Sequence, residues 1–416
     1  MGDRRARECD VAIVGGGPAG LAAATALRES GVKSVLVLER EQEAGGIPRH
    51  CGHYPFGMRE FRRVLRGPDY AERLVDRAHA AGVEIECGVS VVALHEGPRL
   101  TVTSSRGLND IKAKRVLLCT GVRETSRANA LVGGTKPGGI LSTGALQGLV
   151  YLNGMKPFTR PVIVGSELVS FSALLTCRHM GIRPVAMIER RRRPTAYWPS
   201  ALLPWAMRVP LKLGCVVVAV HGEDRVREVV VRDHEGRTET LEADGVIFSG
   251  RFVPEATLVR SSHLTCNAGS GGPEIDQYGR CSDPDYFAAG NLLRAVETAG
   301  WSWQEGTRIG ALIADSLAGR LPTVAAPTLK VTADSDAIKY IVPAQLAPGR
   351  ESGIGTSLQL RVKRPVTGRL HLCVNGKEIW SRRIAALPER RILLPLDCFP
   401  ASAEGVAEIS ITERNS

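Results

Sequence analysis

The chain has 416 residues, of which 44% are hydrophobic and 23% are charged, and its net charge is +11. This length predicts two or three domains with ample core, and the composition is that of an ordinary globular protein. No window is apolar for long enough to cross a membrane. Because no nucleic-acid-binding motif accompanies the basic charge, we expect no nucleic-acid partner, and the charge indicates only an anionic ligand or an acidic partner subunit.

The ten cysteines are scattered along the chain, and no two of them form a CxxC pair. Neither a zinc site nor an iron–sulfur cluster is therefore predicted, and we expect no metal. Cys119 and Cys215 lie in apolar stretches. This placement favours reduced cysteines and a cytoplasmic protein.

Residues 10–39 read DVAIVGGGPAGLAAATALRESGVKSVLVLE and predict two strands joined by a glycine turn and a helix. The first strand covers Val11 to Val14, and a helix of small residues covers Leu21 to Leu27. The second strand, Ser34 to Leu38, ends at Glu39. This succession, with an acid at the end of the second strand, is typical of a dinucleotide-binding unit.

The three glycines of this turn have separate expected roles. Gly15 allows the tight turn, Gly17 lets a diphosphate approach the backbone, and Gly20 lets the helix pack closely on the sheet. The helix N-terminus offers free N–H groups and the positive end of a dipole to the phosphates. Glu39 can accept both hydroxyls of an adenosine ribose. We therefore expect a dinucleotide to lie with its diphosphate on this turn.

Later stretches complete the predicted architecture. KRVLLCTG at 114–121 predicts a buried strand ending in a turn, and YFAAGN at 286–291 predicts another strand followed by a helix start. Between them, a strand at 161–164, a turn beginning at Gly165, a helix and a strand at 184–189 predict a second dinucleotide-binding unit. We predict an α/β fold in which one such domain is inserted in another. The outer domain comprises 1–125 and 245–325, and the inner domain comprises 126–244.

Short alternating strands decorate and follow these domains. Those at 83–94, 99–104 and 110–118 suit a β-meander on the outer domain. Residues 326–416 predict a small β-sandwich-like domain, used for packing or partner contact. Residues 325–353 are either a linker or a first pair of strands. The other strands expected in this domain are 357–364, 368–374, 378–383, 391–396 and 406–411.

Taken together, VAIVGGGPAGLAAA, Glu39, KRVLLCTG and DPDYFAAGN resemble the flavoprotein superfamily with two dinucleotide-binding domains, which includes glutathione and thioredoxin reductases. The resemblance covers about residues 8–320 and implies two Rossmann-like domains in a glutathione-reductase-like arrangement, with FAD as the cofactor. The residues that it implies for FAD binding are Gly15, Gly17, Pro18, Ala19, Gly20, Glu39, Arg40, Gly45, Gly46, Val91, Thr120, Gly121, Gly290, Asn291 and Thr298.

The resemblance also implies a role for several of these regions. The main chain near Gly45 and Gly46 lies beside the ribityl chain, and Val91 supplies a backbone contact to the adenine. Asn291 replaces the aspartate usual in the family, and its amide can still bond a ribitol hydroxyl. The final helix, which starts near Thr298, points its N-terminus toward the flavin and stabilises the reduced, anionic ring.

Within the superfamily, GGIPRHCGHYPFGMREF and VETAGWSWQEG resemble the FAD/NAD-type subunits of opine oxidases, hydrogen cyanide synthase and D-hydroxyproline dehydrogenase. The resemblance implies a subunit of a heteromeric dehydrogenase or oxidase for a small amine, amino acid or hydroxy acid. Its partners would be a small iron–sulfur protein and a second flavoprotein subunit. Several relatives end in a cysteine-rich segment that this chain lacks, which argues against electron transfer through its own C-terminus. A stand-alone NAD(P)H-dependent FAD oxidoreductase and a flavin-binding scaffold without turnover are the alternatives.

The candidate catalytic residues are Arg49, His50, Cys51 and His53. Disulfide reductases of this superfamily need two cysteines, and this region offers only Cys51, so activity of that kind is not expected. A histidine can instead lower the pKa of the thiol or relay a proton, and Arg49 can neutralise a substrate carboxylate. The alternative is a polar cluster that lines a wall and pins a loop. The spacing lacks a fourth ligand for a metal.

The inner glycine turn is degraded relative to the first. It keeps Gly165, but Glu167 stands where the second glycine belongs and Ser170 replaces the third. A carboxylate at this position would crowd and repel a diphosphate, which argues against ordinary NAD(P)H binding. Glu189 ends the following strand and can take an adenosine ribose. The resemblance leaves NAD(P), another adenine nucleotide or an empty second site open, because some of the similar relatives hold another adenine nucleotide or nothing there. The arginines at 190–193 either bind phosphates or form a solvated basic edge.

Residues 196–213 form an apolar segment broken by prolines, with Trp198 and Trp205. Exposed aromatic side chains here would mark a partner interface. Buried ones would make the segment an ordinary connecting helix.

Overall fold

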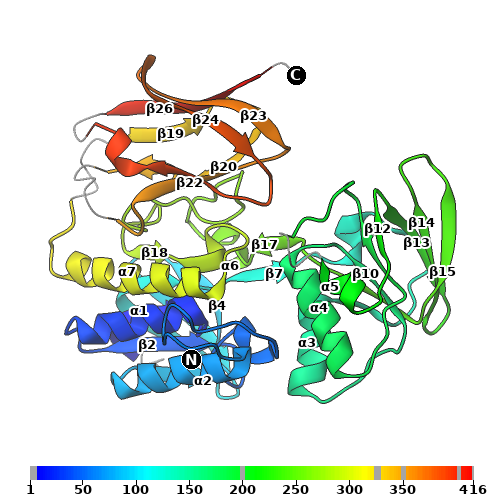
Figure 1. Ribbon diagram of the computed structural model, residues 1–416. Helices are drawn as coiled ribbons and strands as arrows, with labels where there is room; N and C mark the ends of the chain where they lie inside the picture. The colour runs from blue at the N-terminus through cyan, green and yellow to red at the C-terminus, as the bar shows by residue number, and fades with distance from the viewer. Residues whose placement is uncertain (1–6, 197–201, 323–328, 348–352, 401–403, 415–416) are drawn as a thin grey trace. The chain divides into compact units, whose positions relative to one another are not determined.

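The computed structural model describes residues 7–196, 202–322, 329–347, 353–400 and 404–414 (Figure 1). The chain forms two compact units. The outer unit comprises Met1–Gly46, Ala71–Val122 and Pro254–Ser416, and the inner unit comprises Ile47–Tyr70 and Arg123–Val253. Within the described ranges, no helix combines the length and the apolar character needed to cross a membrane.

The outer unit is built on a sheet with parallel strands β1 (Arg7–Val14), β2 (Val35–Glu39), β3 (Glu84–Cys87), β6 (Gly107–Leu118) and β18 (Tyr286–Ala288). Their order is β3-β2-β1-β6, and β18 also pairs with β6. Val11, Ala12 and Ile13 are fully buried, as expected of parallel strands covered on both faces. Because β1 has β2 on one side and β6 on the other, the chain changes winding direction at the end of β1. Open α/β sheets bind their ligands at such a point.

Two helices of the outer unit pack against each other through glycines. A Cβ at Gly306 would lie 2.1 Å from the carbonyl oxygen of Ala19, and one at Gly310 would lie 2.6 Å from that of Ala23. Only glycine permits this approach, so the late helix α7 is fixed on the early helix α1. The helices of this unit are α1 (Pro18–Glu29), α2 (Gly67–Ala80, with its first turn in the inner unit), α6 (Thr257–Arg260) and α7 (Ala299–Leu317).

The predicted meander is present. β4 (Ser90–His95), β5 (Arg99–Ser104) and β6 pair antiparallel in succession. The single strand expected over 83–94 is wrong, because Gly88 adopts a φ of +69° and interrupts it. The part before this glycine, β3, joins the parallel strands beside β2, and the part after it, β4, joins the meander.

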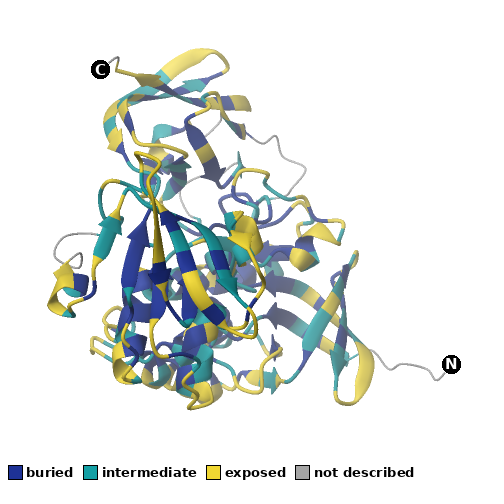
Figure 2. Ribbon diagram, turned by 90° about the vertical axis from the view of Figure 1, so that its right-hand side faces the viewer, coloured by how far each residue is buried: buried dark blue, intermediate teal, exposed yellow. Residues whose placement is uncertain are grey.

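A second parallel sheet forms the inner unit, in the order β12-β11-β10-β16-β9. β10 (Pro161–Val164), α4 (Leu168–His179) and β11 (Ala186–Glu189) are the predicted strand, helix and strand. The strands β10, β11 and β16 (Gly245–Phe248) are buried along almost their whole length (Figure 2). A four-stranded sheet, β15-β14-β13-β8, shares a hydrophobic cluster with them.

The remaining elements of this part of the chain are β7 (Val122–Glu124), β8 (Gly133–Gly134), β9 (Ile140–Ser142), α3 (Thr143–Gln147), α5 (Leu203–Ala206), β12 (Leu211–Leu213), β13 (Val216–Gly222), β14 (Val226–Arg232), β15 (Thr238–Glu242) and β17 (Phe252–Pro254). β7 and β17 form a two-stranded sheet of their own.

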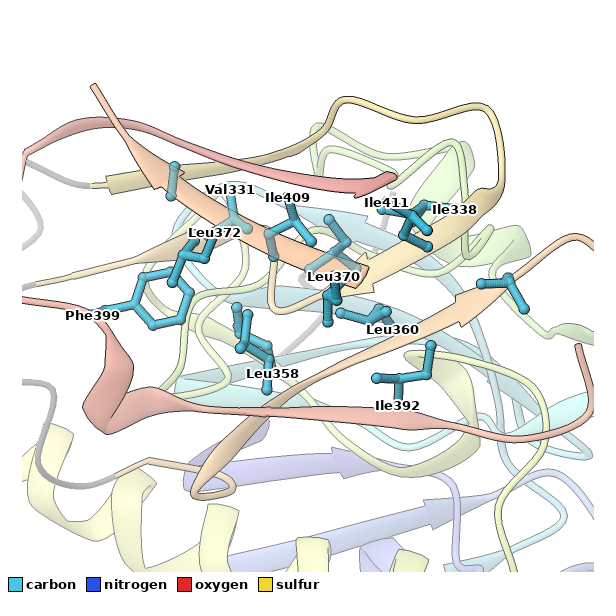
Figure 3. Packing of buried hydrophobic residues seen from close by; sticks show 14 of the residues in the cluster. Val331, Ile338, Leu358, Leu360, Leu370, Leu372, Ile392, Phe399, Ile409 and Ile411 are labelled. Atoms are coloured by element: carbon cyan, nitrogen blue, oxygen red, sulfur yellow. The ribbon is translucent and has the colours of Figure 1, made fainter. Parts of the chain in front are cut away.

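The C-terminal part of the outer unit folds into two small sheets, which we call the β domain. One sheet has the order β21-β19-β26-β23-β24 and the other β20-β22-β25. Figure 3 shows their common core, in which Leu358 and Leu360 of the smaller sheet cluster with Leu370, Leu372 and Ile409 of the larger one. All five side chains are fully buried. The β-sandwich-like domain expected from the alternating pattern is therefore present.

The strands of the β domain are β19 (Leu329–Ala333), β20 (Ile338–Val342), β21 (Gln345–Leu346), β22 (Ser357–Val362), β23 (Val366–Val374), β24 (Lys377–Ala386), β25 (Ile392–Pro395) and β26 (Gly405–Glu413). Of the two possibilities for residues 325–353, the described part therefore contains strands.

The two units differ from the predicted domain boundaries in two respects. Residues 47–70, expected in the outer domain, group with the inner unit. The β domain, predicted as a domain of its own over 326–416, groups with the outer unit. The candidate catalytic residues at 49–53 are therefore held by the inner unit and not by the sheet that carries the first glycine turn.

Candidate functional site

The first glycine turn lies at the carboxyl end of β1, and its geometry requires glycine. Gly15 has a φ of +109°, and a Cβ there would lie 2.5 Å from the carbonyl oxygen of Cys119. A Cβ at Gly20 would lie 2.0 Å from the carbonyl oxygen of Gly15. Near Gly17, by contrast, the first atom met by a Cβ is the Cα of Gly46 at 3.9 Å. Gly15 and Gly20 therefore serve packing, whereas Gly17 leaves the start of α1 open.

The start of α1 offers hydrogen-bond donors. Its N-cap is Gly17, its first residue is Pro18, and no side chain among the described residues caps it. The N–H groups of the first turn, including that of Ala19, have no acceptor within the helix. Together with the helix dipole they can bind an anion such as a phosphate group. The turn therefore fits the diphosphate of a dinucleotide.

Glu39 is held rigidly at the end of β2. Its side chain is buried, with Oε2 accepting the N–H of Gly16 at 2.9 Å and Oε1 accepting the N–H of Glu41 at 2.9 Å. Each carboxylate oxygen has a further lone pair, which suits a pair of ribose hydroxyls. Arg40 is exposed and pairs with Glu41 at 3.4 Å, so it contributes little to this geometry.

Two further main-chain segments border this region. The N–H of Gly45 donates to the carbonyl of Gly16 at 2.7 Å. The segment that we expect beside the ribityl chain therefore lies directly against the first turn. Gly46 follows with a φ of +63°. On the other side, the N–H of Val89 donates to the carbonyl of Glu39 at 2.9 Å. Val91 lies two residues further, in β4.

The late glycine segment meets the same edge of the sheet. Gly290, at the end of β18, has a φ of +73°, and a Cβ there would lie 2.9 Å from the Cβ of Ala19. Thr120, at the end of β6, donates its hydroxyl to the carbonyl of Glu255 at 2.7 Å, and Gly121 follows with a φ of +73°. The structure thus brings together Gly15, Ala19, Thr120, Gly121 and Gly290 at the carboxyl edge of the sheet. A glycine-lined edge of this kind fits FAD.

Asn291 bonds within its own loop. Its Nδ2 donates to the carbonyl of Glu297 at 3.1 Å, and its Oδ1 accepts the N–H of Glu297 at 2.7 Å. An aspartate could accept from the N–H but could not donate to the carbonyl. The departure from the family's aspartate is therefore explained by the closure of a loop. Thr298 is the N-cap of α7.

The candidate catalytic residues do not form an activated thiol. Cys51 is buried and donates its Sγ–H to Oε1 of Gln147 at 3.6 Å. Burial raises the pKa of the Cys51 thiol to about 12, with a smaller contribution in the same direction from the Glu124 carboxylate. Burial also lowers the pKa of His53, whose Nδ1 lies 3.1 Å from the carbonyl of Tyr54. These are the features of an inert thiol and a neutral imidazole.

Arg49 and His50 lie in a short 3-10 helix, Ile47–His50, just before Cys51. Gly67 packs tightly on this segment, since a Cβ there would lie 2.3 Å from the carbonyl oxygens of Pro48 and Cys51. The segment is therefore fixed by backbone packing within the inner unit.

The second glycine turn is filled by a side chain. Gly165 has a φ of +118°, and its Cβ position lies 2.5 Å from Oε2 of Glu167. The Cβ position of Gly250, at the end of β16, lies 2.1 Å from the carboxyl carbon of Glu167. Ser170 donates its hydroxyl to this carboxylate at 2.6 Å, and burial raises the pKa of the Glu167 carboxyl. The carboxylate occupies the place that a diphosphate takes in a dinucleotide turn.

Glu189, the predicted ribose acceptor of the second site, is already engaged. It is buried, and its Oε1 accepts the N–H of Arg191 at 2.8 Å. Its Oε2 accepts the hydroxyl of Ser166 in a short hydrogen bond and that of Thr195 at 3.3 Å. Glu189 thus ties the turn to the loop after β11. Trp205 is 79% exposed, as a partner-facing aromatic would be, whereas Trp198 lies outside the described residues.

Sequence reasoning missed two residues of these sites. Glu305 of α7 accepts the N–H of Gly290 at 2.8 Å and thereby joins the final helix to the glycine segment. Gly250 borders the Glu167 carboxylate. A glycine after an apolar strand is a usable signal, but nothing in the sequence around Glu305 indicates its partner.

Comparisons with known proteins agree with this geometry. The model of the pyridine nucleotide-disulphide oxidoreductase family matches residues 9–306. The ferredoxin reductase component of chlorobenzene dioxygenase from Cupriavidus sp. (strain PS12) is 28% identical over 313 residues, which are 72% of this chain and 69% of that protein. The alpha subunit of sarcosine oxidase from Rhizobium meliloti (strain 1021) is 26% identical over 300 residues, 70% of this chain but only 28% of that protein. One of the subunits of opine oxidase from the same organism is 28% identical over 182 residues, 43% of this chain and 38% of that protein.

Solved structures share the fold. The thioredoxin reductase of T. acidophilum matches with a TM-score of 0.64 and 20% identity, over 75% of this chain and 99% of that one. The L-proline dehydrogenase of P. horikoshii matches with a TM-score of 0.59 and 21% identity, over 78% of this chain and 58% of that one. The predicted fold of two dinucleotide-binding domains is confirmed.

Proposed function

Since the chain belongs to the pyridine nucleotide-disulphide oxidoreductase family and is an FAD-dependent oxidoreductase, we propose that it works as one subunit of a heteromeric dehydrogenase or oxidase. A second flavoprotein subunit would oxidise a small amine, amino acid or hydroxy acid. A small iron–sulfur protein would carry electrons between the two flavins. The relatives from sarcosine oxidase and opine oxidase support this proposal, because both are by name subunits of oxidases.

The observation that carries the proposal is the contrast between the two glycine turns. The first leaves the space above Gly17 open, whereas the second holds the carboxylate of Glu167 between Gly165 and Gly250. A negatively charged diphosphate cannot share that space with a carboxylate. NADH and NADPH are therefore poor electron donors or acceptors for this chain, and a protein partner takes that role.

We propose that the residues of the first site bind and orient FAD. FAD, when bound, supplies the two-electron redox centre that side chains lack. The N–H groups at the start of α1 hold the diphosphate, Glu39 accepts the ribose hydroxyls and the main chain of Val91 contacts the adenine. The N-terminus of α7, after Thr298, presents the positive end of its dipole to negative charge.

Within residues 49–53, we propose that Cys51 is structural. Its buried, weakly acidic thiol is a poor nucleophile. Arg49, His50 and His53 remain our candidates for polar contact with a substrate.

The test is anaerobic mixing of the purified, yellow chain with NADH or NADPH while the flavin absorbance is followed. We expect no bleaching on the time scale of turnover. Addition of a reducing substrate together with the complete complex should bleach the flavin. Reduction of the isolated chain by NADPH at ordinary enzymatic rates would contradict the proposal.

That contrary result would favour a second function, a stand-alone NAD(P)H-dependent reductase. Its support is the 28% identity to the ferredoxin reductase component of chlorobenzene dioxygenase, over 69% of that protein. A flavin that no donor reduces, even in the complete complex, would instead indicate a scaffold without turnover.

A further inference from the structure

The β domain touches the rest of the outer unit at the loop that precedes α7. We call residues 290–298, between β18 and α7, the flavin loop, because Gly290, Asn291 and Thr298 are among the proposed FAD contacts. Asn291 closes this loop by bonding both main-chain groups of Glu297. The side chain of Glu297 takes no part in this closure, and its carboxylate contacts the β domain.

Two arginines of the β domain converge on Glu297. Arg391 donates to its carboxylate at 3.2 Å, and Arg361 of β22 lies 3.5 Å from the other carboxylate oxygen. Arg361 also donates to the carbonyl of Val296 at 3.1 Å. The guanidinium of Arg391 lies 3.9 Å from the ring centroid of Trp301, in the first turn of α7. The β domain therefore grips both the main chain of the flavin loop and the beginning of the final helix.

A second path of contacts runs through Arg294. Its Nε donates to Gln359 of β22 at 2.5 Å, and its Nη2 donates to Glu305 at 2.8 Å. The other oxygen of Glu305 accepts the N–H of Gly290 at 2.8 Å. A continuous chain of hydrogen bonds thus joins a strand of the β domain to the glycine at the edge of the proposed FAD site.

These charges are largely removed from water. The Glu297 side chain is 10% exposed, and that of Arg294 is 5% exposed. Ion pairs in such surroundings hold their partners in place, because loss of one partner leaves an uncompensated buried charge. Simple packing of one domain on another would need no such contacts with the main chain of a loop.

We propose that the β domain is part of the flavin site, with Arg361 and Arg391 as positioning residues that hold the flavin loop and the start of α7. Through them the β domain sets the affinity for FAD and the reduction potential of the bound flavin. This inference rests on the proposed FAD contacts in the flavin loop, and it is independent of which protein or nucleotide delivers electrons.

The test compares Arg361→Met and Arg391→Met, alone and combined, with Arg364→Met. Arg364 is the matched control, because it pairs with Glu413 on the exposed side of the same domain. Measurements are the Kd for FAD with the full-length apoprotein, the midpoint potential and the visible circular dichroism of the bound flavin. We expect the double variant to bind FAD about tenfold or more weakly and to show a shifted potential, because the loop is no longer preorganised. The control Arg364→Met should match the wild type in all three measurements. Arg391→Lys should bind FAD more tightly than Arg391→Met, because it keeps the positive charge.

Variants that bind FAD with unchanged Kd, potential and spectrum, even where the melting temperature falls, would overturn the inference. If the double variant does not fold, Glu297→Gln removes the shared charge with almost no change in shape and gives the same readouts. Rapid reduction of the isolated wild type by NADPH would contradict the proposed function and leave this inference standing. Absence of FAD binding by the wild type would refute both.

Discussion

Replacement of Glu167 by glycine should open the second dinucleotide site. The carboxylate lies where a diphosphate would lie, against the Cβ positions of Gly165 and Gly250. One carboxylate and one phosphate charge about 4 Å apart repel by about 4 kcal/mol at an effective dielectric constant of about 20. That energy corresponds to about a thousandfold in Kd. Glu167 is the N-cap of α4 and makes no capping hydrogen bond, so glycine there costs only a few tenths of a kcal/mol in stability.

The assay is calorimetric titration of the wild type and of Glu167→Gly with NADH, NADPH and ADP. We expect no measurable binding at the second site of the wild type and binding in the micromolar range or tighter in the variant. Glu167→Gln is the matched control, because it removes the charge and keeps the bulk. Equal affinity of wild type and Glu167→Gly for all three ligands would refute the reasoning, because the carboxylate would then not decide access.

Three further predictions concern single side chains. Glu39→Ala should weaken FAD binding by about 1.5–3 kcal/mol, the value of hydrogen bonds to a charged group, and fluorescence titration of the apoprotein measures this; unchanged affinity would remove Glu39 from the site. Cys51→Ala should leave flavin reduction in the complete complex at the wild-type rate, and a large loss in rate would restore the thiol to the reaction. Because burial raises the pKa of Glu167 above its usual 4.5, this group stabilises the fold at pH below 4.5 relative to higher pH. Glu167→Gln should therefore raise the free energy of unfolding at neutral pH but not in acid, and denaturant titrations at the two pH values check the difference.

The first glycine turn could be predicted in detail because its requirements are local. Gly15, Gly20 and Glu39 are set by a turn, a helix and a strand that are neighbours in sequence. The strands of the β domain were likewise predictable from alternation of buried and exposed residues. The expected strand over 83–94 was wrong because the φ of Gly88 sends the chain into a different part of the sheet.

The contacts that organise the flavin loop were beyond prediction from one sequence. Glu297 and Arg391 are 94 positions apart and lie in different domains. Arg391 follows Glu389 and Arg390 in the sequence, and no pattern there indicates Glu297 as its partner. The assignment of residues 47–70 to the inner unit depends on packing against α3 and the segment after it, which no local pattern encodes.

The glycine contact between α1 and α7 has a consequence for synthesis of the protein. Translation delivers β1, α1 and β2 first, but Gly306 and Gly310 emerge only after the whole inner unit. Until then Ala19 and Ala23 of α1 lack the helix on which they pack. The inner unit, complete in the nascent chain by Val253, is free to fold earlier. The outer unit, which contains both early and late parts of the chain, can therefore complete its packing of α1 on α7 only after the inner unit has been made.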